Sequence, residues 1–231
     1  MTTFGLHPGD RVLAVAAHPD DETLGAGGTL ARLADEGVGV HVLAVTCYEL
    51  PRWGTASTPA ERSGQFEAAC DALGVIGRAI AWNGTEQSAR IHDHVRDLVR
   101  VIEDGPELSL NALRPAALLI PAAGAFHQEH QVVHQACFAA ARPGGAQRHT
   151  PRIVLGFDGP EDRAWTAAVR QRPVLVDITA TADAKDKALE CYTGELRAAH
   201  PRSIEAVRAF DTATAGGHGR AEAFTAYRMT W

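Results

Sequence analysis

An imidazole and two adjacent carboxylates stand close together early in the chain, in the stretch Ala17-His18-Pro19-Asp20-Asp21-Glu22. The stretch directly follows the apolar run Val12 to Ala17, which is typical of a strand buried on both faces. We therefore expect its polar side chains at the carboxyl end of that strand, the edge of an open α/β sheet where ligands bind. Nitrogen and oxygen groups of this kind suit a divalent metal. Because neighbouring carboxylates in a turn point in different directions, one can hold the metal while the other accepts a proton from the metal's water.

A structural interpretation of the same acids stays open. Asp20, Asp21 and Thr23 could simply cap the following helix, because acids favour the positive end of the helix dipole. His18 weakens this interpretation, since a smaller residue would serve equally well at a strand end. A similar segment, His7-Pro8-Gly9-Asp10, precedes the strand instead of following it, and we interpret that copy as a turn.

A second group of histidines lies further along the chain. The stretch 126–134 contains His127, His130 and His134, follows another buried apolar run and opens a helical pattern. On its own it could be a solvated helix start. If the sheet has the usual doubly wound order, however, the first and fourth strands are neighbours and their loops flank one crevice. His127 and His130 would then meet the first cluster across that crevice.

Other catalytic patterns are absent. The metalloprotease order His-Glu-x-x-His does not occur, no Gly-x-Ser-x-Gly surrounds any serine, and there is no phosphate-binding loop of the Walker type. The segment Gly25-Ala26-Gly27-Gly28-Thr29-Leu30 is only superficially similar to a dinucleotide fingerprint, because Leu30 takes the third glycine position. We expect these glycines to let a helix pack closely on the sheet.

Short apolar runs alternate with helical patterns along the chain, which predicts βαβ units. The expected strands are 12–17, 38–46, 78–82, 116–121, 153–157, 174–178 and 223–229. The expected helices are 29–36, 61–73, 89–103, 131–141 and 182–199. The predicted fold class is α/β, a single-domain Rossmann-like, mostly parallel sheet with helices on both faces.

The composition excludes several classes of protein. Of the 231 residues, 45% are hydrophobic and 22% charged, and the net charge is -6, which is typical of a soluble globular protein. Such a charge does not attract nucleic acid or anionic lipid. No apolar run approaches the roughly 20 residues of a membrane-spanning helix, and no signal peptide is visible. The four cysteines are far apart, which favours reduced thiols and a cytoplasmic location: Cys47, Cys70, Cys137 and Cys191.

The two clusters together identify a family. Ala17-His18-Pro19-Asp20-Asp21-Glu22 followed by His127-x-Glu129-His130 resembles the PIG-L/LmbE-like zinc-dependent N-deacetylases. These include enzymes that act on N-acetylglucosaminyl lipids, mycothiol- and bacillithiol-type sugar precursors and antibiotic intermediates. The resemblance covers most of the chain and implies a single LmbE-like deacetylase domain over residues 1–231. Its supporting segments are Arg62, 73–75, 176–178, 187–189 and 221–224.

The resemblance implies a metal centre. Carried over by motif position, His18, Asp21 and His130 are the ligands of a catalytic zinc ion (Zn2+). Three protein ligands plus water make up the open geometry of a catalytic zinc site. Fe2+ accepts the same two histidines and one carboxylate, so both ions stay open.

The resemblance also implies the catalytic roles. Asp20 is the general base, and His127 stabilises the oxyanion as an imidazolium. Glu129 stands where the family usually has Asp and orients His127 or His130 from outside the metal's ligand shell. Arg62 and Glu49 are candidate substrate contacts. His134 and Glu22 are expected to be structural.

The sequence departs from the family pattern in four places, which we expect to affect the wall of the substrate pocket. Gln128 replaces a common Pro, and Glu129 is one methylene longer than Asp. Cys47-Tyr48-Glu49 replaces a turn that usually contains Gly, and Gly194-Glu195 replaces a typical Ser-Gln. The metal ligands themselves are unaffected.

The predicted activity is zinc-dependent hydrolysis that removes an acyl group, most often acetyl, from the amide nitrogen of a small molecule. The substrate would be an amino sugar or a small natural-product intermediate. Alternatives are an amidase of the same family that cleaves a thiol conjugate, a metal-binding protein without catalysis, and a nucleotide-binding protein of the same fold class. No nucleic acid or membrane span is expected, and the sequence leaves homo-oligomerisation open.

Overall fold

The apolar runs form one seven-stranded sheet in the order β5-β2-β1-β6-β7-β9-β8. The computed structural model describes residues 2–51, 56–106, 108–144, 148–165, 173–195 and 201–230. The strands of the sheet are β1 (Arg11–Ala16), β2 (Gly39–Cys47), β5 (Gly77–Asn83), β6 (Ala117–Pro121), β7 (Ile153–Phe157), β8 (Pro173–Asp177) and β9 (Ala221–Met229). The strands from β5 to β7 are parallel, whereas β9 runs antiparallel to both β7 and β8. The predicted α/β class with a mostly parallel sheet is confirmed.

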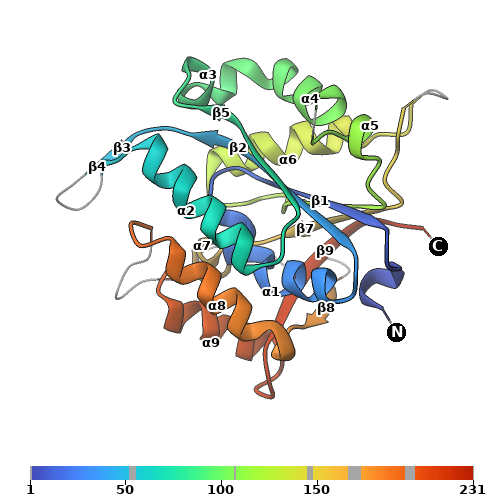
Figure 1. Cartoon of the computed structure of the whole chain (residues 1–231), viewed down its shortest axis with the longest axis vertical. Coiled ribbons are helices and arrows are strands. Elements are labelled where there is room, and N and C mark those ends of the chain that lie inside the picture. The colour runs from blue at the N-terminus through green and yellow to red at the C-terminus, as the bar shows by residue number, and fades with distance from the viewer. Residues whose placement is uncertain are drawn as a thin grey trace.

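Helices cover both faces of this sheet (Figure 1). One face carries α1 (Asp21–Asp35), α2 (Pro59–Ala72), α8 (Ala182–Cys191) and α9 (Ile204–Thr214). The other carries α3 (Glu86–Ala89), α4 (Val95–Asp104), α5 (Leu110–Leu113) and α6 (Gln128–Ala140). The remaining elements are short: α7 (Pro160–Trp165), the 3-10 turns Thr3–Gly5, Ile91–His94 and Thr179–Thr181, and the hairpin of β3 (Leu50–Pro51) and β4 (Ala56–Ser57).

Alternation along the central strand divides the core into two layers. In β1, Val12 and Ala14 pack with α1 and α2, whereas Leu13 and Val15 pack with α4 and α6. All four side chains are fully buried, because successive residues of a strand point to opposite faces and both faces are covered. This explains why the strand is a continuous apolar run.

The glycines of α1 allow a close approach to the sheet. A Cβ atom on Gly25 would lie 2.4 Å from the ring of Phe157, and one on Gly28 would lie 2.5 Å from Ile178 Cδ1. Neither distance is sterically acceptable. The prediction that these glycines serve packing is therefore confirmed.

Helix boundaries differ most from the predictions. α1 begins at Asp21 and not at Thr29, because its glycines and buried polar residues hide the apolar periodicity. α6 begins at Gln128 and not at Gln131, since its first turn is made of polar residues. The single helix expected over 89–103 is divided at 91–94 by a 3-10 turn. α8 ends at Cys191, and α9 was not predicted. The last residues of the helix expected over 182–199 lie outside the described residues.

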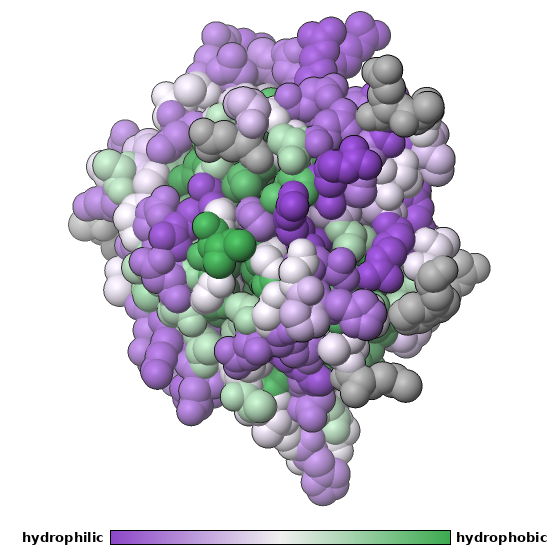
Figure 2. Space-filling view, turned by 45° about the vertical axis from the view of Figure 1, so that its right-hand side comes forward, coloured by the Kyte–Doolittle hydropathy of each residue, from purple (hydrophilic) through white to green (hydrophobic). Residues whose placement is uncertain are grey.

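The surface is mainly polar. The face in Figure 2 is largely hydrophilic, with small separate groups of hydrophobic side chains. None of the helices in the described part of the chain is long and apolar enough to cross a membrane. All four cysteines are free thiols, as expected.

Candidate metal centre

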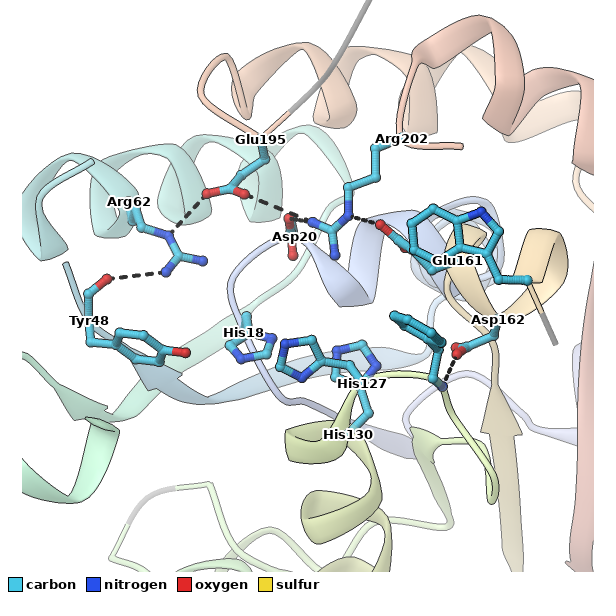
Figure 3. Close-up of a pocket in the computed structure, with 12 residues that line it drawn as sticks. His18, Asp20, Tyr48, Arg62, His127, His130, Glu161, Asp162, Glu195 and Arg202 are labelled. Carbon is cyan, nitrogen blue, oxygen red and sulfur yellow. Dashed lines mark hydrogen bonds and ion pairs between the residues drawn. The ribbon is translucent and has the colours of Figure 1, made fainter. Parts of the chain in front are cut away.

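The loops that follow β1 and β6 meet at one edge of the sheet because these two strands are hydrogen-bonded neighbours. His18 comes from the first loop, His127 from the second loop and His130 from the first turn of α6. The ring of His18 lies 5.1 Å from that of His127 and 5.5 Å from that of His130. The structure therefore brings together the two clusters that the sequence predicts to converge (Figure 3).

Asp21 lies between two of these imidazoles. Its Oδ2 accepts a hydrogen bond from the backbone N–H of His18 at 2.8 Å. The same oxygen is 3.2 Å from His18 Nδ1 and 3.1 Å from His130 Nε2. The ligand atoms of the three residues all lie within 4.8 Å of one another, and all three residues are buried. This trio is a candidate metal site.

The residues present fit a divalent ion. His130 Nε2 is buried without a hydrogen-bond partner among the described residues, although Asp21 Oδ2 is only 3.1 Å away. The ligand atoms of a tetrahedral ion with bonds of about 2.0–2.1 Å are about 3.3–3.4 Å apart. The two separations from Asp21 Oδ2 are close to that value. A divalent cation bound by these residues would be coordinated by His130 Nε2 and would neutralise the buried carboxylate of Asp21.

Asp20 does not cap α1. It occupies the N-cap position, but its side chain makes no capping hydrogen bond, and its backbone φ is 117°. Such a conformation costs a non-glycine residue about 1–3 kcal/mol and is found mostly at functional sites. Asp20 Oδ2 accepts a hydrogen bond from Arg202 at 2.7 Å, while Oδ1 is buried without a partner among the described residues. The capping interpretation therefore fails for Asp20.

The surroundings of Asp20 favour a proton acceptor. Burial raises the pKa of its carboxyl well above the usual range, against the opposing charge of Arg202. For Asp21 the balance is reversed: burial alone would raise its pKa, but His130 and His18 lower it well below the usual range. The two adjacent carboxylates thus differ in proton affinity, and Asp20 is the more basic.

Glu129 contacts a different partner from the one predicted. Its Oε2 hydrogen-bonds to His18 Nε2, and its two oxygens accept from the Tyr48 hydroxyl at 3.3 and 3.4 Å. Its carboxylate makes no hydrogen bond to the described ring of His130, and it is the backbone N–H of Glu129 that bonds to His127. The extra methylene relative to Asp lets the carboxylate extend to His18. Although burial alone lowers the pKa of His18, Asp21 and Glu129 raise it to about 9.

His127 is the N-cap residue of α6. Its Nδ1 accepts the backbone N–H of Glu129 at 3.2 Å, which places the proton of a neutral ring on Nε2. Partial desolvation, together with the charges of His18 and His130, lowers the pKa of His127. The ring is therefore held as a neutral donor, whereas the family resemblance implies an imidazolium.

A cavity of about 240 Å³ opens beside the trio. Its lining residues are His18, Asp20, Tyr48, Arg62, Phe126, His127, His130, Glu161, Asp162, Trp165, Glu195 and Arg202. A chain of ion pairs crosses the upper wall in Figure 3, from Arg62 through Glu195 and Arg202 to Glu161. Phe126 and Trp165, which also line the cavity, form an edge-to-face pair with ring centroids 5.0 Å apart.

Of the two candidate substrate contacts, Arg62 lines this cavity, whereas Glu49 is exposed and is not among its lining residues. Tyr48 and Glu195, two of the departures from the family pattern, also lie on its wall. Arg202 and Glu161 were missed because neither is part of a local motif. Each lies far from the two clusters in sequence, so only the tertiary fold could reveal it.

Two residues expected to be structural are placed accordingly. His134 Nδ1 bonds to the Pro121 carbonyl at 2.8 Å, and its ring stacks on Phe138, away from the trio. Glu22 is fully buried and accepts a hydrogen bond from the Tyr192 hydroxyl at 2.6 Å. Neither residue belongs to the metal trio.

The comparisons with known proteins define the class to which this fold and site belong. Residues 13–141, more than half of the chain, match the PIG-L family, described as GlcNAc-PI de-N-acetylase. The chain therefore belongs to the PIG-L family.

Several curated relatives of this chain are named as sugar deacetylases. The chain is 33% identical over 194 residues to a 1D-myo-inositol 2-acetamido-2-deoxy-alpha-D-glucopyranoside deacetylase of Actinosynnema mirum, covering 73% of this chain and 66% of that protein. It is 34% identical over 163 residues to deacetylase 1 of the same name from Saccharopolyspora erythraea, covering 57% of this chain and 53% of that protein. The chain thus spans about half the length of several curated relatives that it matches.

Solved structures confirm the fold. The conserved protein TT1542 from Thermus thermophilus superposes with a TM-score of 0.74 at 25% identity, covering 95% of this chain and 96% of that one. The A40926 pseudoaglycone deacetylase Dbv21 gives a TM-score of 0.77 at 21% identity, covering 96% and 99%. The 4-carboxy-2-hydroxymuconate hydratase GalB from Pseudomonas putida KT2440 gives 0.68 at 20% identity, covering 96% and 98%. Because a hydratase shares the architecture, the reaction has to be argued from the site.

Proposed function

We propose that this chain is a metal-dependent amide hydrolase that removes an acetyl group from the nitrogen of an amino sugar or a similar small molecule. The observation that carries the proposal is the pairing of two adjacent carboxylates with different partners. Asp21 faces the imidazoles of His18 and His130, whereas Asp20 faces Arg202 and the cavity. A metal-binding protein without catalysis would have no use for the second, strained carboxylate.

His18, Asp21 and His130 would hold the metal ion, with Zn2+ as the first choice and Fe2+ accepted by the same ligands. When bound, such an ion lowers the pKa of a water molecule from 15.7 toward about 7 and polarises the substrate carbonyl. Glu129 orients His18 by accepting a hydrogen bond from its Nε2. This arrangement leaves His18 Nδ1 to face the metal position.

Asp20 Oδ1 accepts the proton of the attacking water. The other oxygen, Oδ2, is held by Arg202, so the carboxylate keeps one orientation and its unpartnered oxygen is the reactive one. The new C–O bond forms at the amide carbon as this proton is transferred. Asp20 then returns the proton to the nitrogen as the C–N bond breaks, so that acetate and a free amine are released.

His127 stabilises the negative charge that develops on the carbonyl oxygen. Its Nδ1 is occupied by the backbone N–H of Glu129, so the donor is Nε2–H. The ring is fixed before the substrate arrives, because it is both the helix cap and part of the cavity wall. A preorganised donor of this kind typically contributes about 10²–10³ in rate.

The substrate class follows from the cavity and the relatives. The cavity wall contains two arginines and an edge-to-face aromatic pair, which suit the hydroxyls and the apolar face of a sugar ring. Several relatives are named as deacetylases of an inositol-linked acetamido sugar. We propose that residues 1–231 carry out this reaction as one domain.

A substrate panel tests the proposal. Metal-loaded protein would be incubated with N-acetylglucosamine, an N-acetylglucosaminyl inositol, N-acetylated amino acids and an N-acylated thiol conjugate, and acetate and free amine would be measured separately. We expect equal amounts of acetate and amine from the sugars, and none after chelation. Cleavage of the thiol conjugate alone would favour the amidase alternative. No amine from any substrate would refute the hydrolase.

A further inference from the structure

A second cavity, of about 430 Å³, lies at the amino ends of the strands, the opposite edge of the sheet from the metal centre. It is lined by Gly9, Asp10, Arg11, Arg114, Ala116, His149, Thr150 and Arg152. Arg11 is the first residue of β1, Arg114 precedes β6, and Arg152 immediately precedes β7. Since β1, β6 and β7 are adjacent and parallel, three arginines from distant parts of the sequence surround one cavity. We call this the arginine cavity.

The arginine cavity is positively charged although the whole chain has a net charge of -6. Among the described residues that line the cavity there are three guanidinium groups and one carboxylate, that of Asp10. Asp10 Oδ2 is already engaged by the backbone N–H of His7 at 2.9 Å and by Arg152 at 3.1 Å. Its charge therefore compensates one guanidinium at most, and the cavity keeps an excess of positive charge.

Most guanidinium donors stay available to a ligand. Arg11 uses one nitrogen to hold the Leu113 carbonyl at 2.7 Å, which fixes the side chain at the cavity wall. Arg152 uses one nitrogen on Asp10. Within the described part of the chain, the Arg114 side chain makes no ion pair or hydrogen bond, and the residue is exposed. Each guanidinium has five N–H donors, so the larger part of this donor set is unused.

The backbone at Arg114 gives a second, independent indication. Arg114 is the C-cap residue of α5 and has φ 51° and ψ 55°, a left-handed conformation that favours glycine. A glycine here would avoid the strain and cap the helix equally well. The larger side chain adds nothing to the packing of the helix end, but it places a guanidinium beside the cavity.

We propose that the arginine cavity binds a phosphorylated small molecule, whose phosphate group is held by Arg11, Arg114 and Arg152. Guanidinium groups match phosphate oxygens in bidentate geometry, and a group with two negative charges and three terminal oxygens suits three of them. The volume exceeds that of inorganic phosphate alone and lies in the usual range of small-molecule pockets. A sugar phosphate or nucleotide is of suitable size. The site is independent of the proposed hydrolysis.

The test measures binding of pyrophosphate and inorganic phosphate to the full chain by calorimetry at constant ionic strength, with citrate as a carboxylate control. Metal is removed with a chelator, so that phosphate has no metal to bind. The central variant is Arg114→Gly. It should weaken pyrophosphate binding by about tenfold or more, because charge-assisted contacts are lost. Its melting temperature should be equal to or above that of the wild type, because glycine suits the backbone there.

Three variants complete the design. Arg152→Gln should weaken binding in the same way as Arg114→Gly. Arg100→Gln, an exposed arginine outside the cavity, and His130→Ala, at the metal centre, should leave the affinity for pyrophosphate within about twofold of wild type. Absence of binding to the wild-type chain, or unchanged affinity in both cavity variants, would overturn the proposal. Citrate bound as tightly as pyrophosphate would overturn the assignment to phosphate.

Discussion

Two buried clusters of charge contact α1, and they are balanced in different ways. In the first, Lys185 Nζ lies 2.9 Å from Asp211 and 2.8 Å from Glu222, and all three side chains are fully buried. Arg220 adds a second cation 3.0 Å from Asp211. Glu222 also accepts the backbone N–H groups of Gly28 and Thr29. We call this the lysine cluster.

The metal centre is equally buried but incompletely satisfied. His130 Nε2 and Asp20 Oδ1 have no partner among the described residues, whereas Lys185 Nζ and all four carboxylate oxygens of Asp211 and Glu222 are paired, and Arg220 Nε is the atom of the lysine cluster left unpaired there. The carboxylates of the lysine cluster therefore have their counter-charges within this chain. The difference indicates how a structural ion cluster can be told from a ligand site. Both contain buried carboxylates, but in the ligand site a carboxylate oxygen and an imidazole nitrogen are left without a partner among the described residues.

The largest expected effect is at His130. His130→Ala removes one of three protein ligands, so metal content should fall from about one ion per chain to near zero and activity should be lost. In chelator, its free energy of unfolding should also fall, because the buried carboxylate of Asp21 loses the imidazole that lies 3.1 Å from its Oδ2. Metal analysis and denaturant unfolding measure both effects. His134→Ala, one helical turn further on, is the control that should keep the metal. Full occupancy in His130→Ala would contradict the assignment.

The next effect concerns Asp20. Asp20→Asn preserves the shape of the side chain but cannot accept a proton, so kcat should fall by about 10²–10⁴ with metal content unchanged. Steady-state kinetics and metal analysis on the same preparation measure this. Asp97→Asn, an exposed acid outside the cavity, should behave like the wild type. Loss of metal together with activity would mean that the roles of Asp20 and Asp21 are reversed.

In the lysine cluster, by contrast, we expect a substitution to lower the stability of the protein and to leave metal binding unchanged. Lys185→Met leaves two buried carboxylates without their shared cation, which should lower the free energy of unfolding by about 3–5 kcal/mol. The folded fraction should still bind metal normally. Urea unfolding measures the change, and Lys187→Met, an exposed neighbour on the same helix, should change stability by less than about 0.5 kcal/mol. A stable Lys185→Met protein would remove the distinction between the two clusters.

The smallest effect is expected at His127. His127→Ala should retain the metal and lose about 10²–10³ in kcat with little change in KM, because the lost hydrogen bond strengthens only as charge develops on the substrate oxygen. His92→Ala, an exposed histidine remote from the cavity, is the control. If His127→Ala instead loses metal, His127 is a ligand and not a donor.

The sequence predicted the location of the site better than its interactions. His18 and Asp21 could be placed beside His127 and His130, because each cluster follows a strand and strand order brings the two strands together. The start of α1 could not be predicted, since the glycines that fit against Phe157 and Ile178 break the apolar periodicity. Tertiary contacts determine those positions, and local propensity does not.

The hydrogen-bond partners of Asp20 and Glu129 could not be predicted from the sequence. Arg202 reaches Asp20 from 182 positions away. Whether Glu129 bonds to His18 or to His130 depends on one methylene and on where α6 begins. Both are consequences of packing between elements that are distant in the chain, and no local spacing encodes them.

The position of β9 has a consequence for biosynthesis. β9 is synthesised after the other six strands of this sheet, yet it lies inside the sheet, between β7 and β8. Until it emerges from the ribosome, β7 and β8 have no common neighbour and both expose unpaired edges. Glu222 on β9 also completes the lysine cluster and holds the backbone of α1 at Gly28. α1 therefore gains its contact with Glu222 only after β9 has been made, and the complete sheet can form only from that point on.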